Sequence, residues 1–230
     1  MLSINRSTNN PLEIIIKEYD LPDNELLQGE PLSYCFMVWI PAFTCVVLGQ
    51  SNEVEDALYV ENILNDHIPV YKRPSGGEAV VLSPRMVVVS VLKRGDKFRA
   101  PGFYFKTYNE RIIDALRSVG VKELKTGGIS DICIRDRKIL GSSIYRSKDL
   151  VFYHAVLNIS ESSSLMDRYL KHPRREPGYR GGRVHGEFVT SLTREGYELS
   201  PEEIRQAISA LRGRGLGETS WDQISKSSDS

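Results

Sequence analysis

Short apolar runs separated by turn residues fill most of the chain between residues 34 and 159. Runs rich in Val, Ile and aromatic side chains predict β-strands, because these side chains pack well on a pleated, half-buried surface. Turn residues between two pairs of runs, at residues 83–85 and 136–137, predict two hairpins. The predicted strands cover residues 34–40, 44–48, 70–72, 79–82, 86–92, 132–135, 138–144 and 151–159.

The helical spacing of apolar residues predicts three helices, over residues 52–65, 105–119 and 200–211. The third begins with Ser200 as its cap and Pro201 in the first helical position, and Glu203 completes a capping box. Several hairpins with helices between them, and no regular βαβ alternation, predict an α+β fold. We expect a mostly antiparallel β-sheet with flanking helices.

The 230 residues fit one domain, which we place at residues 1–216, followed by a polar and disordered tail at residues 217–230. Thirty Lys and Arg balance thirty Asp and Glu, so we expect no nucleic-acid partner, since phosphate binders are usually basic. No apolar stretch is long enough to cross a bilayer, and the first residues do not resemble a signal peptide. Three scattered cysteines indicate a reducing compartment, so we expect a cytoplasmic protein without a membrane partner.

The segment Arg73-Pro74-Ser75-Gly76-Gly77 is the first candidate site. Paired glycines let the backbone approach a ligand closely, and successive N–H groups can bind an anion beside the charge of Arg73. The alternative is a plain turn between strands. The segment is neither a P-loop nor a Rossmann fingerprint.

The hairpin that contains Asp131 and Lys138 is the second candidate site. These residues lie on strands predicted to pair, so both side chains can reach one site. There Asp131 can hold Mg²⁺, and Lys138 can neutralise a carboxylate or a phosphate. Gly141 and Ser142 leave room for a ligand beside the strand. The alternative is an exposed hairpin whose charges are solvated.

Several other residues carry weaker signals. His154 lies inside an apolar strand, where a histidine is more often part of the core than catalytic. The histidines and cysteines show no metal-ligand spacing, so we predict no structural metal site. Cys35, Cys45 and Cys133 lie in apolar strands, which favours inert core thiols. The basic segment 171–183, rich in Pro and Gly, fits a cover over a phosphate-bearing ligand, a surface for an acidic partner or a solvated loop.

Taken in order, these segments resemble the lipoate–protein ligase A family of the biotin/lipoate ligase and octanoyltransferase superfamily. The family carries an Arg-x-Ser-Gly-Gly-Gly-Ala-Val loop, an Asn-Asp-Ile strand, a Lys-Ile-x-Gly-Ser-Ala turn, a His-His-Gly strand and a final Val-Thr-x-Leu. The corresponding segments here are RPSGGEAV (73–80), SDI (130–132), KILGSS (138–143), FYHA (152–155) and FVTSL (188–192), and VVLGQSN (46–52) resembles a segment further upstream.

The resemblance implies a biotin/lipoate-ligase-like catalytic domain that uses ATP to convert lipoate or octanoate into an acyl-adenylate. The acyl group then passes to a lysine of a lipoyl domain of a 2-oxoacid dehydrogenase or of a glycine-cleavage H protein. A separate accessory subunit is also implied, because few residues follow Leu192. Lys138 is implied as the catalytic residue and Asp131 as a ligand of Mg²⁺. The residues implied to bind substrate or nucleotide are Arg73, Ser75, Gly76, Gly77, Glu78, Ala79, Asp131, Gly141, Ser142 and His154.

The chain departs from the family pattern at Glu78, where the third loop glycine is expected, and at Leu82, near the place of a histidine. Two alternatives therefore stay open. One is an octanoyl- or lipoyltransferase of the same fold that carries the acyl group on a cysteine, although no cysteine precedes the FVTSL segment closely. The other is a non-catalytic relative that only binds a lipoyl domain or a ligand.

Overall fold

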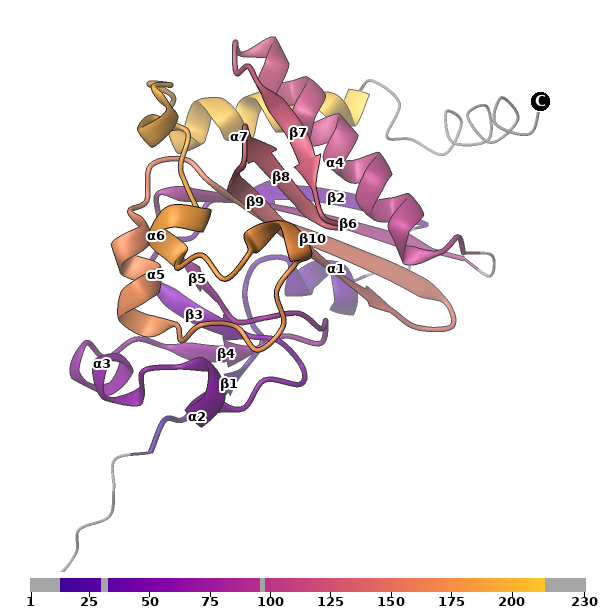
Figure 1. Ribbon diagram of the computed structural model, residues 1–230. Coiled ribbons are helices and arrows are strands. Elements are labelled where there is room, and N and C mark those ends of the chain that lie inside the picture. The colour runs from indigo at the N-terminus through magenta and orange to yellow at the C-terminus, as the bar shows by residue number, and fades with distance from the viewer. Residues whose placement is uncertain (1–12, 30–32, 96–97, 214–230) are drawn as a thin grey trace, which may run out of the picture.

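The computed structural model describes residues 13–29, 33–95 and 98–213, and its strands form two sheets (Figure 1). All neighbours in the larger sheet are antiparallel. In spatial order the larger sheet contains β2 (Tyr34–Trp39), β6 (Met86–Arg94), β10 (Leu150–Asn158), β9 (Arg137–Arg146), β8 (Asp131–Ile134) and β7 (Leu124–Gly127). The smaller sheet contains β1 (Ile16–Glu18), β4 (Val70–Lys72), β3 (Cys45–Leu48) and β5 (Val80–Leu82). In this sheet β4 runs parallel to both neighbours, and β5 is antiparallel to β3.

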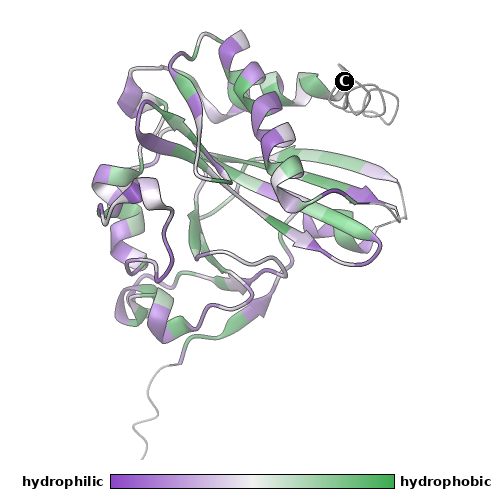
Figure 2. Ribbon diagram, turned by 45° about the vertical axis from the view of Figure 1, so that its right-hand side comes forward, coloured by the Kyte–Doolittle hydropathy of each residue, from purple (hydrophilic) through white to green (hydrophobic). Residues whose placement is uncertain are grey.

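The larger sheet is covered on both faces. Helices α4 (Pro101–Ser118) and α7 (Pro201–Ser209) pack together on one face, and the smaller sheet packs on the other (Figure 1). Since successive side chains of a strand point to opposite faces, Val87 and Val89 of β6 contact the helical side, whereas Val88 packs with the smaller sheet. Figure 2 shows the result, with hydrophobic residues concentrated on the strands.

Short helices and 3₁₀ turns complete the structure. They are α1 (Asn24–Gln28), α2 (Val54–Ala57), α3 (Val60–Asn65), α5 (Ser163–Tyr169) and α6 (His185–Phe188), with 3₁₀ turns η1 (Gly178–Arg180), η2 (Thr193–Glu195) and η3 (Ala210–Gly213). In the described part of the chain, no helix is both long enough and apolar enough to span a membrane.

The predicted fold class is confirmed: the larger sheet is antiparallel and helices flank it. The helix over residues 105–119 is confirmed as α4, and the capping box of Ser200 and Glu203 opens α7. The hairpin around residues 136–137 is confirmed as β8 and β9. The domain boundary at residue 216 stays a prediction, and the predicted tail at residues 217–230 lies outside the described residues.

Two local predictions were wrong. Residues 52–65 form two short helices rather than one, because Leu58 between them is extended and makes a β-bridge with Leu170. The turn at residues 83–85 does not join a hairpin. The strand before it, β5, pairs with β3 in the smaller sheet, whereas β6 belongs to the larger one, so the chain crosses between sheets at this turn.

Candidate active site

A cavity of about 910 Å³ lies between residues of the two sheets. Its apolar wall includes Val47, Val81, Val88, Leu140 and Val156, each from a different strand. The predicted site residues that line the cavity are Arg73, Gly77, Glu78, Ala79, Asp131, Lys138, Gly141, Ser142 and His154; Ser75 and Gly76 do not line it. The structure therefore brings the two sequence candidates, the glycine loop and the β8–β9 hairpin, to one cavity.

Lys138 and Asp131 form an ion pair at the cavity wall, with 2.9 Å between Nζ and Oδ1. A break in the strand register makes this possible. Asp131 lies opposite Gly141, but between Ile132 and Cys133 the register shifts, so that Cys133 lies opposite Lys138. Without this bulge, positions 138 and 141 would point to opposite faces of the sheet. With it, the Lys138 side chain crosses over Gly141.

Gly141 is required by this crossing. A Cβ atom at residue 141 would lie 2.6 Å from Nζ of Lys138, closer than a non-bonded contact allows. The next residue, Ser142, donates its hydroxyl to the backbone oxygen of Ser130 over 2.6 Å, which joins the two strands beside the ion pair. Gly141 thus leaves the space through which Lys138 reaches Asp131.

The second carboxylate oxygen of Asp131 accepts a hydrogen bond of 2.7 Å from the hydroxyl of Tyr179. The Tyr179 ring lies against Gly127 and Gly128, where an added Cβ atom would meet it at 2.9 Å and 3.3 Å. Burial and the neighbouring Asp131 raise the pKa of Tyr179, so this hydroxyl stays protonated and donates. The segment 171–183, which we call the strap, is therefore anchored at the lysine pair.

Arg73 shapes the glycine loop. Its guanidinium is buried and donates to the backbone oxygens of Val47, Gly76 and Glu78 and to Oγ of Ser75. Burial lowers the pKa of Arg73 to about 10, so it is charged at neutral pH. Four of the five N–H groups of this arginine are therefore used within the protein.

The backbone conformation of the loop accommodates a residue other than glycine at position 78. Positive φ falls on Gly77, at 91°, and Glu78 is not among the residues with positive φ. Gly49 allows the backbone after β3 to approach the glycine loop closely, since a Cβ atom at position 49 would lie 2.0 Å from the backbone oxygen of Gly77. A glycine is thus required at positions 49 and 77 but not at position 78. The Glu78 carboxylate accepts from the backbone N–H of Arg175 in the strap over 3.3 Å.

Two further strap residues fix it on the side of α2. Arg174 pairs with Asp56 at 2.5 Å, and Lys171 donates to the backbone oxygen of Glu55. Because Tyr179 holds Asp131 on the larger sheet, the strap runs across the cavity and is fastened at both sides.

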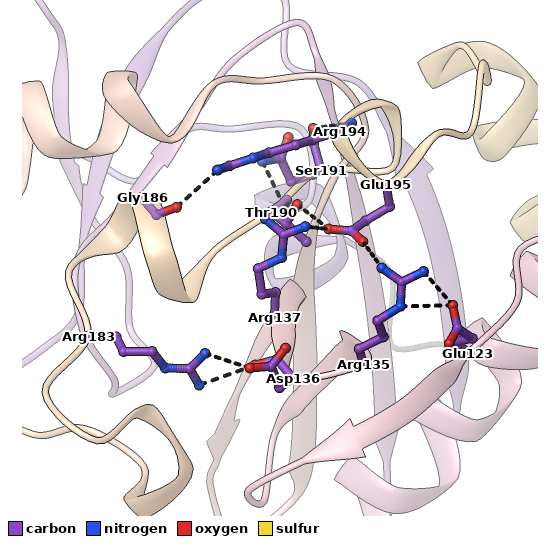
Figure 3. Close-up of polar contacts among 11 residues, drawn as sticks. Glu123, Arg135, Asp136, Arg137, Arg183, Gly186, Thr190, Ser191, Arg194 and Glu195 are labelled. Carbon is purple, nitrogen blue, oxygen red and sulfur yellow. Dashed lines mark hydrogen bonds and ion pairs between the residues drawn. The ribbon is translucent and has the colours of Figure 1, made fainter.

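Ion pairs of Arg135 and Arg137 with Glu195 hold the β8–β9 hairpin against the C-terminal part of the domain (Figure 3). The Glu195 side chain is only 2% exposed and bonds to Arg137, Arg135 and the hydroxyl of Thr190. The backbone N–H of Thr190 donates to the oxygen of Lys138 over 2.9 Å. We call Arg135, Arg137, Thr190 and Glu195 the Glu195 clamp.

The cysteines lie away from this chemistry. None of Cys35, Cys45 and Cys133 lines the cavity. Burial raises the pKa of Cys45 to about 12 and also raises that of Cys133, so both thiols are protonated at neutral pH. Within residues 13–29, 33–95 and 98–213, no three His, Cys, Asp or Glu side chains converge as they would around a metal ion.

Residues 23–211 match the sequence family described as the lipoyl protein ligase A/B catalytic domain. This match extends over most of the chain. The protein belongs to that family. The resemblance drawn from the motifs is therefore confirmed.

Relatives in the lipoyl ligase family share low identity with the chain. Lipoate–protein ligase 1 of Staphylococcus aureus is 26% identical over 171 residues, which cover 74% of this chain and 49% of that protein. The chain thus spans about half the length of this relative. A solved bipartite lipoate protein ligase with its E2 lipoyl domain, from Thermoplasma acidophilum, has a TM-score of 0.66 and 20% identity, with coverage of 77% and 69%. A lipoate-protein ligase A bound with ATP has a TM-score of 0.64 and 21% identity, with coverage of 76% and 69%.

Sequence reasoning missed several residues of this candidate site. Tyr179 was overlooked because the segment 171–183 was interpreted from its basic residues, although Tyr179 is the one Phe, Tyr or Trp residue in it. Ser143 of β9 lies 3.0 Å from Ser75, and Ser90 of β6 donates to Asp23. Ser90 is a polar residue inside an apolar run, and such a buried side chain needs a partner, which was the available signal.

Proposed function

We propose that this protein is the catalytic domain of an ATP-dependent lipoate–protein ligase. It would activate lipoate or octanoate as an acyl-adenylate and pass the acyl group to a lysine of a partner protein. The observation that carries this proposal is the Lys138–Asp131 pair in a cavity with an apolar wall on one side and a glycine loop on another. Family membership and the names of the relatives support it.

In the first step, the acyl carboxylate attacks the α-phosphorus of ATP and pyrophosphate leaves. Negative charge gathers where the carboxyl and phosphoryl groups meet, and the Lys138 ammonium group would stabilise it there. The backbone of Gly77 and Glu78, which line the cavity and are shaped by Arg73, would bind the carboxyl and phosphate oxygens. The apolar side chains of the cavity would hold the acyl chain, and the volume suits a ligand of this size.

In the second step, the acceptor lysine attacks the acyl carbonyl and AMP leaves. We propose a lipoyl domain as the acceptor, because a structural neighbour was solved as a ligase together with its E2 lipoyl domain. A glycine-cleavage H protein is the second candidate. We also propose that a separate accessory subunit completes the enzyme and that it works in the cytoplasm, where the free cysteines stay reduced.

Magnesium would enter with the phosphates of ATP rather than occupy a resident site. Asp131 is the carboxylate proposed to bind it, but both of its oxygens already have partners, Lys138 and Tyr179. A carboxylate oxygen has two lone pairs, so Oδ2 of Asp131 can bind the ion beside the Tyr179 hydroxyl. A single carboxylate plus substrate phosphates and water is an ordinary arrangement for Mg²⁺.

The positions of the cysteines do not support the alternative of a transferase that forms a thioester. A transferase of that kind needs an accessible thiolate, whereas both Cys45 and Cys133 are buried with raised pKa values. The non-catalytic alternative depends on Glu78, whose carboxylate faces the strap.

The test is adenylate formation. Purified protein with Mg²⁺, ATP and lipoate or octanoate should release pyrophosphate and form the acyl-adenylate. Lys138→Ala should abolish this activity, while Lys125→Ala, on an exposed position of the neighbouring β7, should retain it. Full activity in Lys138→Ala would refute the role of Lys138. A folded wild type that forms no adenylate from either lipoate or octanoate would favour the binding alternative or the need for the accessory subunit.

A further inference from the structure

A row of polar side chains connects Arg73 to a buried carboxylate on the N-terminal segment. Nε of Arg73 donates to Oγ of Ser75 over 2.9 Å, and Oγ of Ser75 lies 2.6 Å from Nε2 of His154. On the other side of the ring, Nδ1 of His154 lies 3.8 Å from Oδ2 of Asp23. Asp23 thus stands at the far end of a row that begins in the glycine loop.

Asp23 is held firmly where it faces the histidine. Its side chain has no exposed surface, and it accepts hydrogen bonds from Tyr19 at 2.8 Å and from Ser90 at 2.7 Å. A buried carboxylate is costly unless positive charge lies near it. Arg73 has no carboxylate within ion-pair distance in the described part of the chain. Ser75 and His154 therefore connect the buried guanidinium of Arg73 to the buried carboxylate of Asp23.

The strand register explains how this row forms. His154 on β10 lies directly opposite Ser90 on β6. Both are polar positions on buried strands, and both point to the side of the larger sheet that carries the smaller sheet, as Val88 and Val156 do. The Asp23 carboxylate contacts both side chains, since it accepts a hydrogen bond from Ser90 and faces His154.

The contacts of His154 determine which of its ring nitrogens carries the hydrogen. Burial lowers the pKa of His154, so the ring is neutral near pH 7 and carries one N–H. An N–H at Nδ1 facing the Asp23 carboxylate is favoured over a lone pair facing the same charge. Nε2 is then an acceptor, so Ser75 donates to His154 and accepts from Arg73. Every donor in the row points from the guanidinium towards the carboxylate.

We propose that Asp23 is a positioning residue for acyl-adenylate formation. It sets the tautomer of His154, which orients Ser75 and Arg73 and, through them, the loop backbone. This inference rests on the proposed function. Arg73 carries the effect to the loop because its Nη2 donates to the backbone oxygens of Gly76 and Glu78 at 2.8 Å and 2.9 Å.

The row contains Ser, His and Asp, yet Ser75 is not a nucleophile. Ser75 is 1% exposed and does not line the cavity, so no substrate carbon reaches it. Its oxygen also accepts from Arg73 and lies 3.0 Å from the Ser143 hydroxyl, which fills its hydrogen-bonding capacity. The arrangement orients the loop and forms no acyl-serine.

The variant Asp23→Asn keeps the size of the side chain and removes its charge. We expect kcat for lipoate-dependent pyrophosphate release to fall about tenfold, the scale of one lost charge-assisted contact. Tyr19→Phe is the matched control, because it removes a hydrogen bond to the same carboxylate and leaves the charge. It should stay within about twofold of the wild type.

The readout that separates positioning from packing is the tautomer of His154, measured by ¹⁵N NMR of the four histidines, with His154→Gln to assign its signal. The wild type should show Nδ1–H, and Asp23→Asn should show Nε2–H or a mixture. A wild type with Nε2–H overturns the proposal even if Asp23→Asn does not fold. Equal losses of melting temperature and kcat in Asp23→Asn and Tyr19→Phe, with an unchanged tautomer, also overturn it. If the wild type forms no adenylate, the proposed function fails, and the tautomer switch alone decides whether Asp23 controls His154.

Discussion

Removing Arg137 should destabilise the protein more than removing its partner Glu195, although the two side chains form one ion pair (Figure 3). The Glu195 side chain is 2% exposed and that of Arg137 is 28% exposed. Arg137→Ala leaves a buried carboxylate with the Thr190 hydroxyl and with Arg135 at 3.5 Å. Glu195→Ala removes the buried charge and leaves an arginine that water can reach.

The magnitudes follow from this difference. Leaving an uncompensated buried charge costs about 3–5 kcal/mol, and Arg135 recovers part of that cost for Arg137→Ala, so we expect about 3 kcal/mol. Glu195→Ala loses bonds to two arginines that water reaches and leaves only the neutral Thr190 hydroxyl buried, which costs about 1.5 kcal/mol. At about 2–4 °C per kcal/mol for a chain of this size, the melting temperature should fall roughly 6–12 °C and roughly 3–6 °C, respectively.

Calorimetry and urea unfolding of both single variants and the double variant measure these effects. The double variant should be about as stable as Glu195→Ala, because Arg137 contributes little once the buried carboxylate is gone. Arg205→Ala is the control, since Arg205 pairs with Glu202 at an exposed position and its loss should leave the melting temperature close to that of the wild type. Equal losses for Arg137→Ala and Glu195→Ala, or an additive double variant, would refute the burial argument.

Three further predictions concern the cavity. Gly141→Ala places a Cβ atom 2.6 Å from Nζ of Lys138, so adenylate formation should fall at least about tenfold in a turnover assay. Its melting temperature should change by less than about 2 °C, since the flexible lysine can move away. Glu78→Gln removes a negative charge from the cavity wall, so the KM for ATP in the same assay should fall about threefold. Wild-type stability should decrease as the pH falls below about 6.5, because the unfolded chain then protonates a histidine that the fold keeps neutral. His154→Gln should weaken that pH dependence in urea unfolding.

Each of these variants has a matched control. Gly102→Ala adds a Cβ atom that meets nothing within 4 Å and lies outside the cavity, so it should keep its activity. Glu187→Gln changes an exposed carboxylate outside the cavity and should leave the KM for ATP unchanged. His67→Gln changes an exposed histidine and should keep the wild-type pH dependence. If a variant gives the same activity, KM for ATP or pH dependence as its control, the argument for that residue is refuted.

The sequence predicted the hairpin of the lysine pair but not its geometry. Val, Ile and Leu runs around a turn are a local pattern, and they gave β8 and β9 correctly. The bulge that brings Lys138 over Gly141 is a property of the pairing of two strands, and Lys138 also makes a β-bridge with the distant Val189. Neither feature leaves a periodic signal along the chain. The false hairpin at residues 83–85 has the same origin, since two adjacent strands look alike whether they pair with each other or join separate sheets.

The position of Asp23 explains why the row of polar side chains from Arg73 to Asp23 was not predicted from the sequence. It lies 50 residues from Arg73 along the chain, in a short segment without a motif. What the sequence did contain were two unexplained polar residues on buried strands, Ser90 and His154. Each needs a partner, but only the register that places them opposite each other shows that one carboxylate can serve both.

The substitution of a glycine by Glu78 poses an electrostatic problem rather than a steric one. Gly77 supplies the positive φ of the loop, and Glu78 contributes its backbone oxygen to Arg73, as any residue could. Because most of the Arg73 donors are used within the protein, the charges left for phosphate are those of Lys138 and the strap. The Glu78 carboxylate already faces that strap through Arg175. A bound nucleotide would therefore compete with Glu78 for the same positive segment, and removing this one charge should strengthen ATP binding without altering the loop.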